Sequence, residues 1–249
     1  MKIALCFYGQ FGKKNINSRF GYMTKEQYNS IDNIWSINHY KKYVIQNYDV
    51  DVFFHCWNEE HKDFLVKHYN PKSYLFEKQN KKQQMWGENN NRSIKNNNPR
   101  LISEQKSFRL VLTYEKKKNF KYDLVFHTIF DQLFFTKINF NKLNNEYIYT
   151  SIRYMKNDLL LKKTINQFYD QWYIGKSEYL KHFIGDKVLP YFQKYKVKDY
   201  GSHIQRYKLV EDLGLINKFK YILYPGTDHN KVNQIFCSHY IHNLKKIIS

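Results

Sequence analysis

The sequence predicts one α/β domain whose mostly parallel sheet is flanked by helices, and three observations lead to this fold class. Short apolar runs rich in β-branched and aromatic residues alternate with stretches whose apolar residues recur at helical spacing. Hydrophobic residues make up 42% of the 249 residues and aromatic residues 18%, which excludes a disordered chain. Only 9 Gly and 4 Pro leave little room for linkers. We therefore expect residues 1–249 to form a single domain.

The first third of the chain predicts the repeating part of the sheet. Residues 2–8 (KIALCFY) are apolar after Lys2 and lead to Gly9 and Gln10, as a buried strand followed by a turn does. The elements after it are a helix at 31–46, a strand at 49–57, a helix at 60–69 and a strand at 73–76. This alternation implies parallel strands joined by right-handed crossovers.

A polar stretch at 79–100 interrupts the alternation. It is rich in Asn, Lys and Gln, which predicts a solvated loop; the alternative is a lid over a substrate, with Trp86 as a stacking platform. Ser103 is then placed to cap a helix over 102–117. The remaining expected elements are two apolar runs within 122–135, strands at 146–151, 168–175 and 221–224, and helices at 176–195 and 204–213.

The charge balance favours anionic partners. Lys and Arg number 41 against 22 Asp and Glu, which gives a net charge of +19. Nucleic acid, a phosphorylated small molecule and the face of an anionic membrane all fit such a surface. The Lys residues are also scattered among Asn, Ile and Tyr, as the residue usage of an A+T-rich genome would produce.

The three cysteines predict buried free thiols in a reducing compartment. Cys6, Cys56 and Cys237 lie far apart, and none belongs to a CxxC pair. The apolar run at the N-terminus is too short for a signal peptide, and no run approaches the roughly 18 apolar residues of a membrane span. We therefore expect a cytoplasmic protein.

Polar side chains recur where the predicted strands end, and this pattern predicts a ligand cleft. The carboxyl ends of strands in an α/β sheet are where ligands bind. Two of these strand-end residues are the carboxylates Asp131 and Asp170. One of the two is suited to hold a divalent ion on a diphosphate, and the other to take a proton from a hydroxyl. Asp131 alone also fits a helix or turn cap without chemistry. The strand-end residues are Gly9, Gln10, His55, His127, Asp131 and Asp170.

Five segments together resemble the GT-A-type glycosyltransferase-like proteins of bacteria and large DNA viruses. They are MKIALCFYGQFG, DVDVFFHCWN, YNPKSYLFEKQ, YDLVFHTIFDQLF and DQWYIGKSE, and they span residues 1 to about 180. The resemblance implies a GT-A/Rossmann-like nucleotide-sugar domain in the cytoplasm of a bacterium or an infected host cell.

The resemblance also implies roles for particular residues. Gly9, Gln10 and Phe11 would lie in the donor site, and Asp131 would hold Mn²⁺ or Mg²⁺ on the donor diphosphate in place of a DxD motif. Asp170 would serve the acceptor side or act as the catalytic base, with His127 as the second catalytic candidate. The basic donor-site candidates are Arg19 and Arg109.

The chain departs from the family pattern at two positions. Ile129 stands two residues before Asp131, so the motif keeps one carboxylate, and His127 stands where related proteins tend to have Arg. Arg109 or Lys121 is therefore the alternative to a metal for neutralising the diphosphate.

We expect a glycosyltransferase that moves a sugar from a nucleotide-sugar donor to a hydroxyl acceptor on a glycan or glycoconjugate. Peripheral contact with an anionic membrane is compatible with this activity. A binding-only relic of the fold is one alternative, and a non-catalytic basic nucleic-acid-binding protein is the other.

Overall fold

The computed structural model describes residues 1–11, 34–78, 92–130, 132–134, 138–150, 171–186, 188–194, 202–222 and 235–237. Residues 79–91 of the stretch at 79–100, for which a solvated loop or alternatively a lid with Trp86 is predicted, lie outside these residues. The prediction that all of 1–249 forms one domain therefore stays a prediction.

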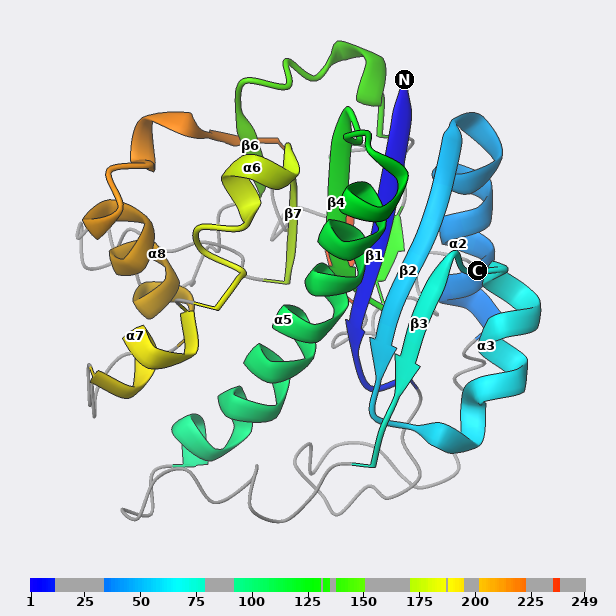
Figure 1. Ribbon diagram of the computed structural model, residues 1–249, viewed down its shortest axis with the longest axis horizontal. Helices are drawn as coiled ribbons and strands as arrows, with labels where there is room; N and C mark the ends of the chain where they lie inside the picture. The colour runs from blue at the N-terminus through cyan, green and yellow to red at the C-terminus, as the bar shows by residue number, and fades with distance from the viewer. Residues whose placement is uncertain are drawn as a thin grey trace, which may run out of the picture.

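A seven-stranded sheet forms the centre of the molecule, in the order β3-β2-β1-β4-β7-β6-β8 (Figure 1). β3, β2, β1 and β4 are mutually parallel, as predicted, while β7 is antiparallel to both of its neighbours. β5 and β9 pair separately as an antiparallel ribbon. The strands are β1 (Lys2–Gly9), β2 (Asp49–Cys56), β3 (Ser73–Phe76), β4 (Leu124–Ile129), β5 (Gln132–Phe134), β6 (Ile148–Thr150), β7 (Trp172–Gly175), β8 (Phe219–Tyr221) and β9 (Ile235–Cys237).

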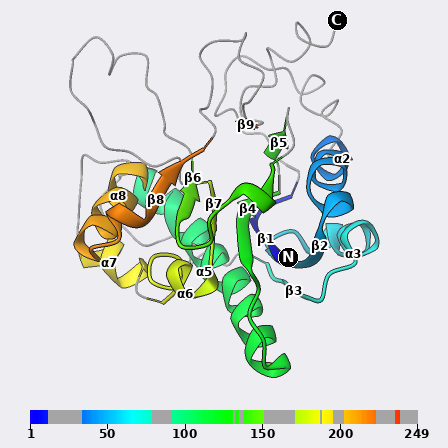
Figure 2. The same ribbon diagram turned by 90° about the horizontal axis from the view of Figure 1, so that it is seen from above.

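Helices cover both faces of the sheet, which accounts for the unbroken apolar sequence of β1. Ile3, Leu5 and Phe7 face one core together with α2 and α3, whereas Ala4 and Cys6 face the other core with α5. Figure 2 shows α2 and α3 on one side of β1 and α5 on the other. The helices are α2 (Ile34–Tyr43), α3 (Lys62–Tyr69), α5 (Arg92–Lys118), α6 (Ser177–Leu180), α7 (Val188–Lys194) and α8 (Ser202–Asp212). Short 3₁₀ helices lie at Ile45–Asn47, Glu59–His61, Phe140–Lys142 and Ile216–Lys218.

Helix α5 begins at Arg92, so the loop predicted for residues 79–100 is wrong for its last nine residues. Pro99 lies inside this helix, and its carbonyl oxygen accepts a hydrogen bond from the Trp57 indole N–H at 3.1 Å. Because the helix starts eleven residues before Ser103, this serine is not its N-cap. Ser103 is instead buried against the sheet.

The C-terminal elements differ from prediction mainly at their ends. The helix expected at 176–195 is divided into α6 and α7, and β7 begins at Trp172 rather than at 168. Gly214 follows the end of α8: its φ of +66° is in the left-handed region, and its N–H donates to the Glu211 carbonyl at 2.9 Å. None of the described helices is long and apolar enough to cross a membrane.

Cys6 and Cys56 are buried free thiols, as predicted. Burial raises the pKa of Cys6 to about 12 and that of Cys56 to about 11. Both side chains are therefore neutral at physiological pH.

Candidate functional site

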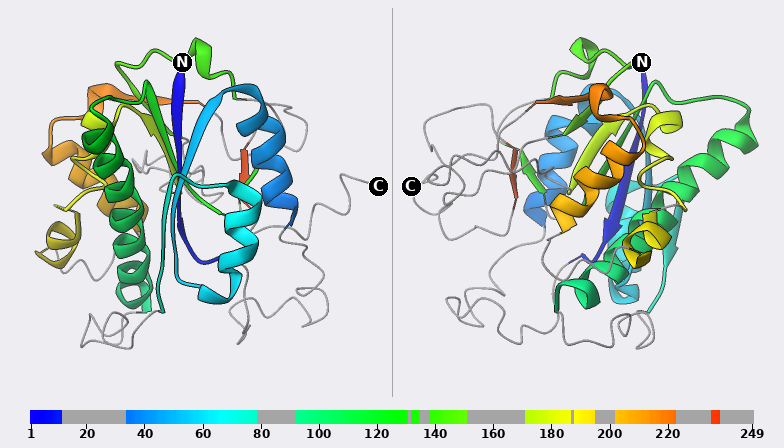
Figure 3. Two further views of the ribbon diagram at one scale, coloured as in Figure 1. Left: turned by 45° about the vertical axis from the view of Figure 1, so that its right-hand side comes forward. Right: turned by 90° about the vertical axis from the view of Figure 1, so that its left-hand side faces the viewer.

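The carboxyl ends of the parallel strands meet at one edge of the sheet, and this edge is the candidate site. Gly9 ends β1 beside Cys56, which ends β2, and Tyr8 pairs with Ile129, which ends β4. The first turns of α5 lie at the same end of the molecule (Figure 3, left). The strand ends therefore converge as the sequence predicts.

Three of the predicted site residues, Arg19, Asp131 and Asp170, lie outside the described part of the chain. Their roles stay predictions. The strand that follows Asp170, β7, begins at Trp172, and Trp172 pairs with Thr128 near the end of β4. The chain thus leaves β4 and enters β7 at this same edge of the sheet.

The turn Gly9–Phe11 has a geometry that requires glycine at its first position. Gly9 has a φ of +106°, a conformation that side-chain-bearing residues rarely adopt. Its N–H donates to Ser103 Oγ at 2.7 Å, and the Phe11 N–H donates to Asn58 Oδ1 at 3.2 Å. These two N–H groups are therefore occupied, and Gln10 is the exposed residue of the turn.

A chain of side-chain hydrogen bonds continues inward from Gly9. Ser103 Oγ lies 2.7 Å from His55 Nδ1, and His55 Nε2 lies 3.1 Å from Glu77 Oε2. Lys106 donates to the same carboxylate oxygen. Burial lowers the pKa of His55 to about 4, against the opposing pull of Glu77, so the ring is neutral at pH 7.

The hydrogen-bonded residues Ser103, His55 and Glu77 are of the types found in a hydrolase triad, but a substrate cannot reach the serine hydroxyl. Ser103 and His55 are each 0% exposed, and the serine oxygen already accepts the Gly9 N–H. A nucleophile must reach its substrate. This chain is therefore part of the scaffold of the site.

A second network brings cationic charge to the site. Glu104 accepts hydrogen bonds from Arg100 Nε at 3.1 Å and from Arg206 Nη2 at 2.5 Å, and Glu104 and Arg206 are each 1% exposed. The Glu104 carboxylate thus binds two guanidinium groups. Arg100 also donates to the Tyr8 hydroxyl at 3.3 Å, and this hydroxyl donates to the Gln171 carbonyl at 3.1 Å.

Sequence reasoning missed Arg100, Glu104 and Arg206. Arg100 stands at the end of the low-complexity stretch, and Arg206 lies within an ordinary amphipathic segment. The i,i+4 spacing of Arg100 and Glu104 is the one sequence signal, and this spacing is also common on solvated helix faces.

His127 lies beneath the site rather than on its surface. Its ring is 0% exposed and stacks on Tyr8, with centroids 4.6 Å apart and an interplanar angle of 17°. Nε2 lies 3.3 Å from the Glu104 carbonyl oxygen and 3.2 Å from Ser107 Oγ. Burial is the main cause that lowers the pKa of His127 to about 3; the hydrogen bond to the Glu104 carbonyl opposes it, and the charges of Arg206 and Arg100 act in the same direction as burial. The ring is therefore neutral at pH 7. In this arrangement, His127 reaches the surface of the site only through Tyr8.

Arg109 and Lys121, the basic residues expected near the diphosphate, lie elsewhere. Arg109 Nη2 is 2.5 Å from Asp186 Oδ1, and its side chain is 61% exposed. It is nine residues along α5 from Arg100, about 13 Å at 1.5 Å per residue. Lys121 pairs with Glu115 at 2.7 Å and precedes the amino end of β4, the opposite edge of the sheet.

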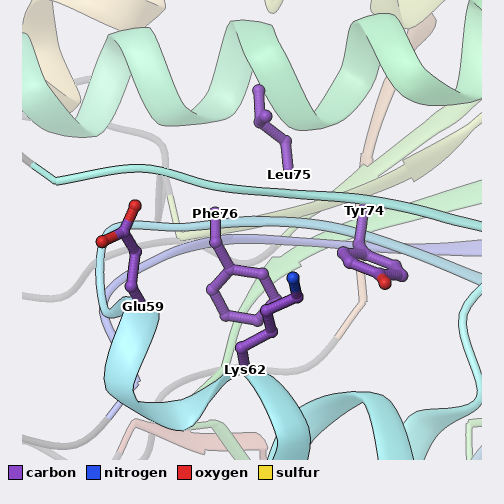
Figure 4. Close-up of a pocket in the computed structure, with 5 residues that line it drawn as sticks. All are labelled: Glu59, Lys62, Tyr74, Leu75 and Phe76. Atoms are coloured by element: carbon purple, nitrogen blue, oxygen red, sulfur yellow. The ribbon is translucent and has the colours of Figure 1, made fainter.

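The described residues contain no group of three or more His, Cys, Asp or Glu side chains arranged to hold a metal ion. A separate hollow of about 350 Å³ lies between α3 and β3. Figure 4 shows Tyr74 and Phe76 pointing toward α3 beside Glu59 and Lys62, while Leu75 points toward α5. The hollow flanks the edge strand of the sheet and does not include the Gly9 turn.

No protein-family model matches the chain, and no curated protein matches it. Among solved structures it is similar to the galactosyltransferase LgtC in complex with donor and acceptor sugar analogs, with 12% identity over 90% of this chain and 73% of that one, at a TM-score of 0.45. It is similar to the apo form of the glycosyltransferase GlyE from Streptococcus pneumoniae TIGR4, with 9% identity over 89% of this chain and a TM-score of 0.40. In that comparison the chain spans 44% of the GlyE chain.

A cytidylyltransferase from Leptospira borgpetersenii serovar Hardjo-bovis is also similar, with 11% identity over 98% of this chain and 84% of that one, at a TM-score of 0.40. At these identities and TM-scores, none of these likenesses decides what this chain binds. The candidate site therefore rests on its own geometry.

Proposed function

We propose that this protein transfers a sugar from a nucleotide-sugar donor to a hydroxyl acceptor. The observation that carries the proposal is the Tyr8–Gln171 hydrogen bond. It joins the residue before the Gly9 turn to the residue after Asp170, at the edge where β4 ends just before Asp131. Tyr8, Gln171 and the end of β4, which are far apart in the sequence, thus lie at one edge of the sheet.

The two guanidinium groups of the Arg100–Glu104–Arg206 cluster support a donor with a charged leaving group. A nucleoside diphosphate gains negative charge as the bond to the sugar breaks, and guanidinium groups stabilise such charge with short, charge-assisted hydrogen bonds. Arg100 is the cluster member whose side chain is partly exposed, at 23%. We therefore assign it the diphosphate-neutralising role that the sequence predicts for Arg109 or Lys121.

The reaction requires one proton acceptor. The acceptor oxygen bonds to the anomeric carbon, the bond from that carbon to the diphosphate oxygen breaks, and the electron pair leaves with the diphosphate. Asp170 takes the hydroxyl proton. Tyr8 and Gln171 hold the backbone next to Asp170 in this arrangement.

Asp131 is the residue we propose for a divalent cation. Mg²⁺ is commonly held by one or two carboxylates together with substrate phosphates, so a single carboxylate fits this use. A bound Mn²⁺ or Mg²⁺ would supply Lewis-acid stabilisation of the diphosphate. Arg100 supplies positive charge with or without the ion.

Thermal unfolding with UDP, GDP, CMP and dTDP sugars, each with and without Mn²⁺, tests the proposal. A donor near 100 times its Kd adds about 2.7 kcal/mol of stability. One nucleotide should stabilise the protein, and Asp131→Asn should remove any dependence on Mn²⁺. Absence of stabilisation by every nucleotide sugar, together with salt-sensitive binding of an oligonucleotide, would instead favour the nucleic-acid-binding alternative.

Arg100→Gln and Arg109→Gln decide which arginine binds the phosphates. We expect Arg100→Gln to weaken nucleotide-sugar binding by about 1.5–3 kcal/mol, the range for a hydrogen bond to a charged group. Each variant is compared with its own ligand-free unfolding temperature, because Arg100 also pairs with buried Glu104. A larger loss for Arg109→Gln would restore the assignment made from the sequence.

A further inference from the structure

We propose that Ser103 and His55 are positioning residues that hold the Gly9–Phe11 turn in the shape the donor site uses. The identity of the donor in this inference rests on the proposed function. The geometry of the turn does not depend on it. Ser103 lies on α5, His55 lies on β2, and Gly9 ends β1. Hydrogen bonds of 2.7 Å on either side of the serine oxygen join these three elements.

At neutral pH, the donors and acceptors of the Gly9–Ser103–His55–Glu77 hydrogen bonds can be assigned in one consistent direction. A serine hydroxyl has one proton to donate, and a neutral imidazole has one N–H and one acceptor nitrogen. Glu77 Oε2 faces His55 Nε2 at 3.1 Å, so the ring proton is on Nε2. His55 Nδ1 then accepts the Ser103 proton, and the Ser103 oxygen is left to accept the Gly9 N–H.

The far end of the chain is anchored as well. Glu77 directly follows β3, and its carboxylate binds both His55 and Lys106, which is three residues beyond Ser103 on α5. The ends of β1, β2 and β3 are thereby fastened to a single helix face. A buried network in which every member is satisfied fixes one geometry more strictly than packing alone.

In the proposed site, Gly9 therefore sets the conformation of the turn, and Gln10 contacts the donor. With its N–H held inward and a φ of +106°, Gly9 turns the chain so that Gln10 is exposed. Asn58 holds the other side of the turn through the Phe11 N–H at 3.2 Å. The Gln10 side chain is therefore the part of the turn assigned to the donor.

Glycine-selective ¹⁵N labelling gives a direct test, because the chain has only 9 Gly. The Gly9 amide of the parent protein should exchange its hydrogen slowly, and Ser103→Ala should speed this exchange by about tenfold or more. Ser103→Thr keeps the hydroxyl and should restore slow exchange. A Gly9 amide that exchanges as fast in the parent as in a free loop overturns the proposal, whether or not Ser103→Ala folds.

Ser107→Ala is the matched control. Ser107 is also 0% exposed on the same helix, four residues further on, but its hydroxyl contacts the Glu104 carbonyl and His127 Nε2 rather than the turn. Both alanine variants lose a buried hydroxyl, yet only Ser103→Ala should speed the hydrogen exchange of the Gly9 amide. An equal effect of the two variants would mean that Ser103 contributes to stability alone.

Binding of the nucleotide sugar found in the thermal screen gives the second readout. Ser103→Ala should weaken that binding by about tenfold, the effect of one lost hydrogen bond in a positioning network, and Ser103→Thr should recover it. Failure of every nucleotide sugar to bind the parent protein would contradict the proposed function, while the Gly9 amide would still decide the role of Ser103. Unchanged binding in Ser103→Ala, despite a released Gly9 amide, would overturn the assignment of the turn to the donor.

Discussion

Glu104 is a buried carboxylate that binds the guanidinium groups of Arg100 and Arg206. It and Arg206 are each 1% exposed, and Arg206 also donates to the Phe183 carbonyl oxygen. Removing one partner of a buried ion pair leaves an uncompensated charge in a medium that solvates it poorly. The cluster is therefore sensitive to any loss of the Glu104 charge.

We expect Glu104→Gln to lower the free energy of unfolding by about 3–5 kcal/mol, the usual cost of breaking a buried ion pair. The control is Asp186→Asn, which breaks an Arg–carboxylate pair that is 61% and 73% exposed. Exposed pairs contribute about 0–1 kcal/mol. Urea unfolding of both variants measures the difference, and similar losses in the two would contradict the role given to Glu104.

At the scale of elements, α5 carries most of the site and also contains an interior proline. Pro99 is the eighth residue of this helix, beyond the first turn, where a missing N–H leaves a helix hydrogen bond unformed. Pro190 is the third residue of α7 and lies within its first turn, where no intrahelical bond is lost.

Pro99→Ala should therefore stabilise the protein, whereas Pro190→Ala should change stability little. An interior proline costs about 3 kcal/mol relative to alanine. The lost burial of the Pro99 ring offsets part of this gain, so we expect a net increase of about 1–2 kcal/mol. Urea unfolding measures the free energy of unfolding of both variants. A destabilised Pro99→Ala would show that the packing of the proline ring contributes more than the helix hydrogen bond gained with alanine.

The parts of the fold that were predictable are those in which sequence pattern and burial agree. β1 and β2 are rich in buried apolar residues because helices cover both of their faces, and β3 has its predicted bounds, residues 73–76. The start of α5 was not predictable because residues 92–98 are almost entirely polar and end in three Asn. Ser103 and Glu104 look like solvated helix positions in the sequence and are buried only because distant residues bond them.

The candidate site follows the same division. The convergence of strand ends at Gly9 and Ile129 could be predicted, because parallel strands align their carboxyl ends. Arg100 and Arg206 could not, since their roles depend on how α5 and α8 pack together. Such contacts leave no local signal in the sequence.

At the scale of the whole molecule, two buried histidines couple stability to pH. The pKa of His55 is lowered to about 4 and that of His127 to about 3, from an ordinary value of 6.5. In the unfolded chain both take up protons as the pH falls through 6.5, while the folded protein resists until the lower values. Their stabilising contribution is therefore complete above pH 6.5 and is lost as the pH falls toward 3–4.

We expect the free energy of unfolding to decrease steadily from pH 7 to pH 5, by a few kcal/mol in total. The lowered pKa values of Glu77 and Asp186 act below their ordinary values of 4.5 and 3.8, so they affect a lower pH range. Urea titrations at half-unit intervals of pH measure the slope. A flat profile from pH 7 to 5, or an equal slope in His127→Phe, would contradict this assignment.

The reactivity of the two buried thiols, Cys6 and Cys56, can be used to measure how often the central strands of the sheet separate. Cys6 lies on β1 and Cys56 on β2, both 0% exposed, and only a thiolate reacts readily with alkylating reagents. Their raised pKa values and their burial mean that iodoacetamide can modify them only in molecules whose central strands have separated. The modification rate of these two cysteines, followed by peptide mass spectrometry in sub-denaturing urea, should therefore rise in parallel with global unfolding. Faster modification of Cys56 than of Cys6 would locate the first opening at β2 and its neighbour β3.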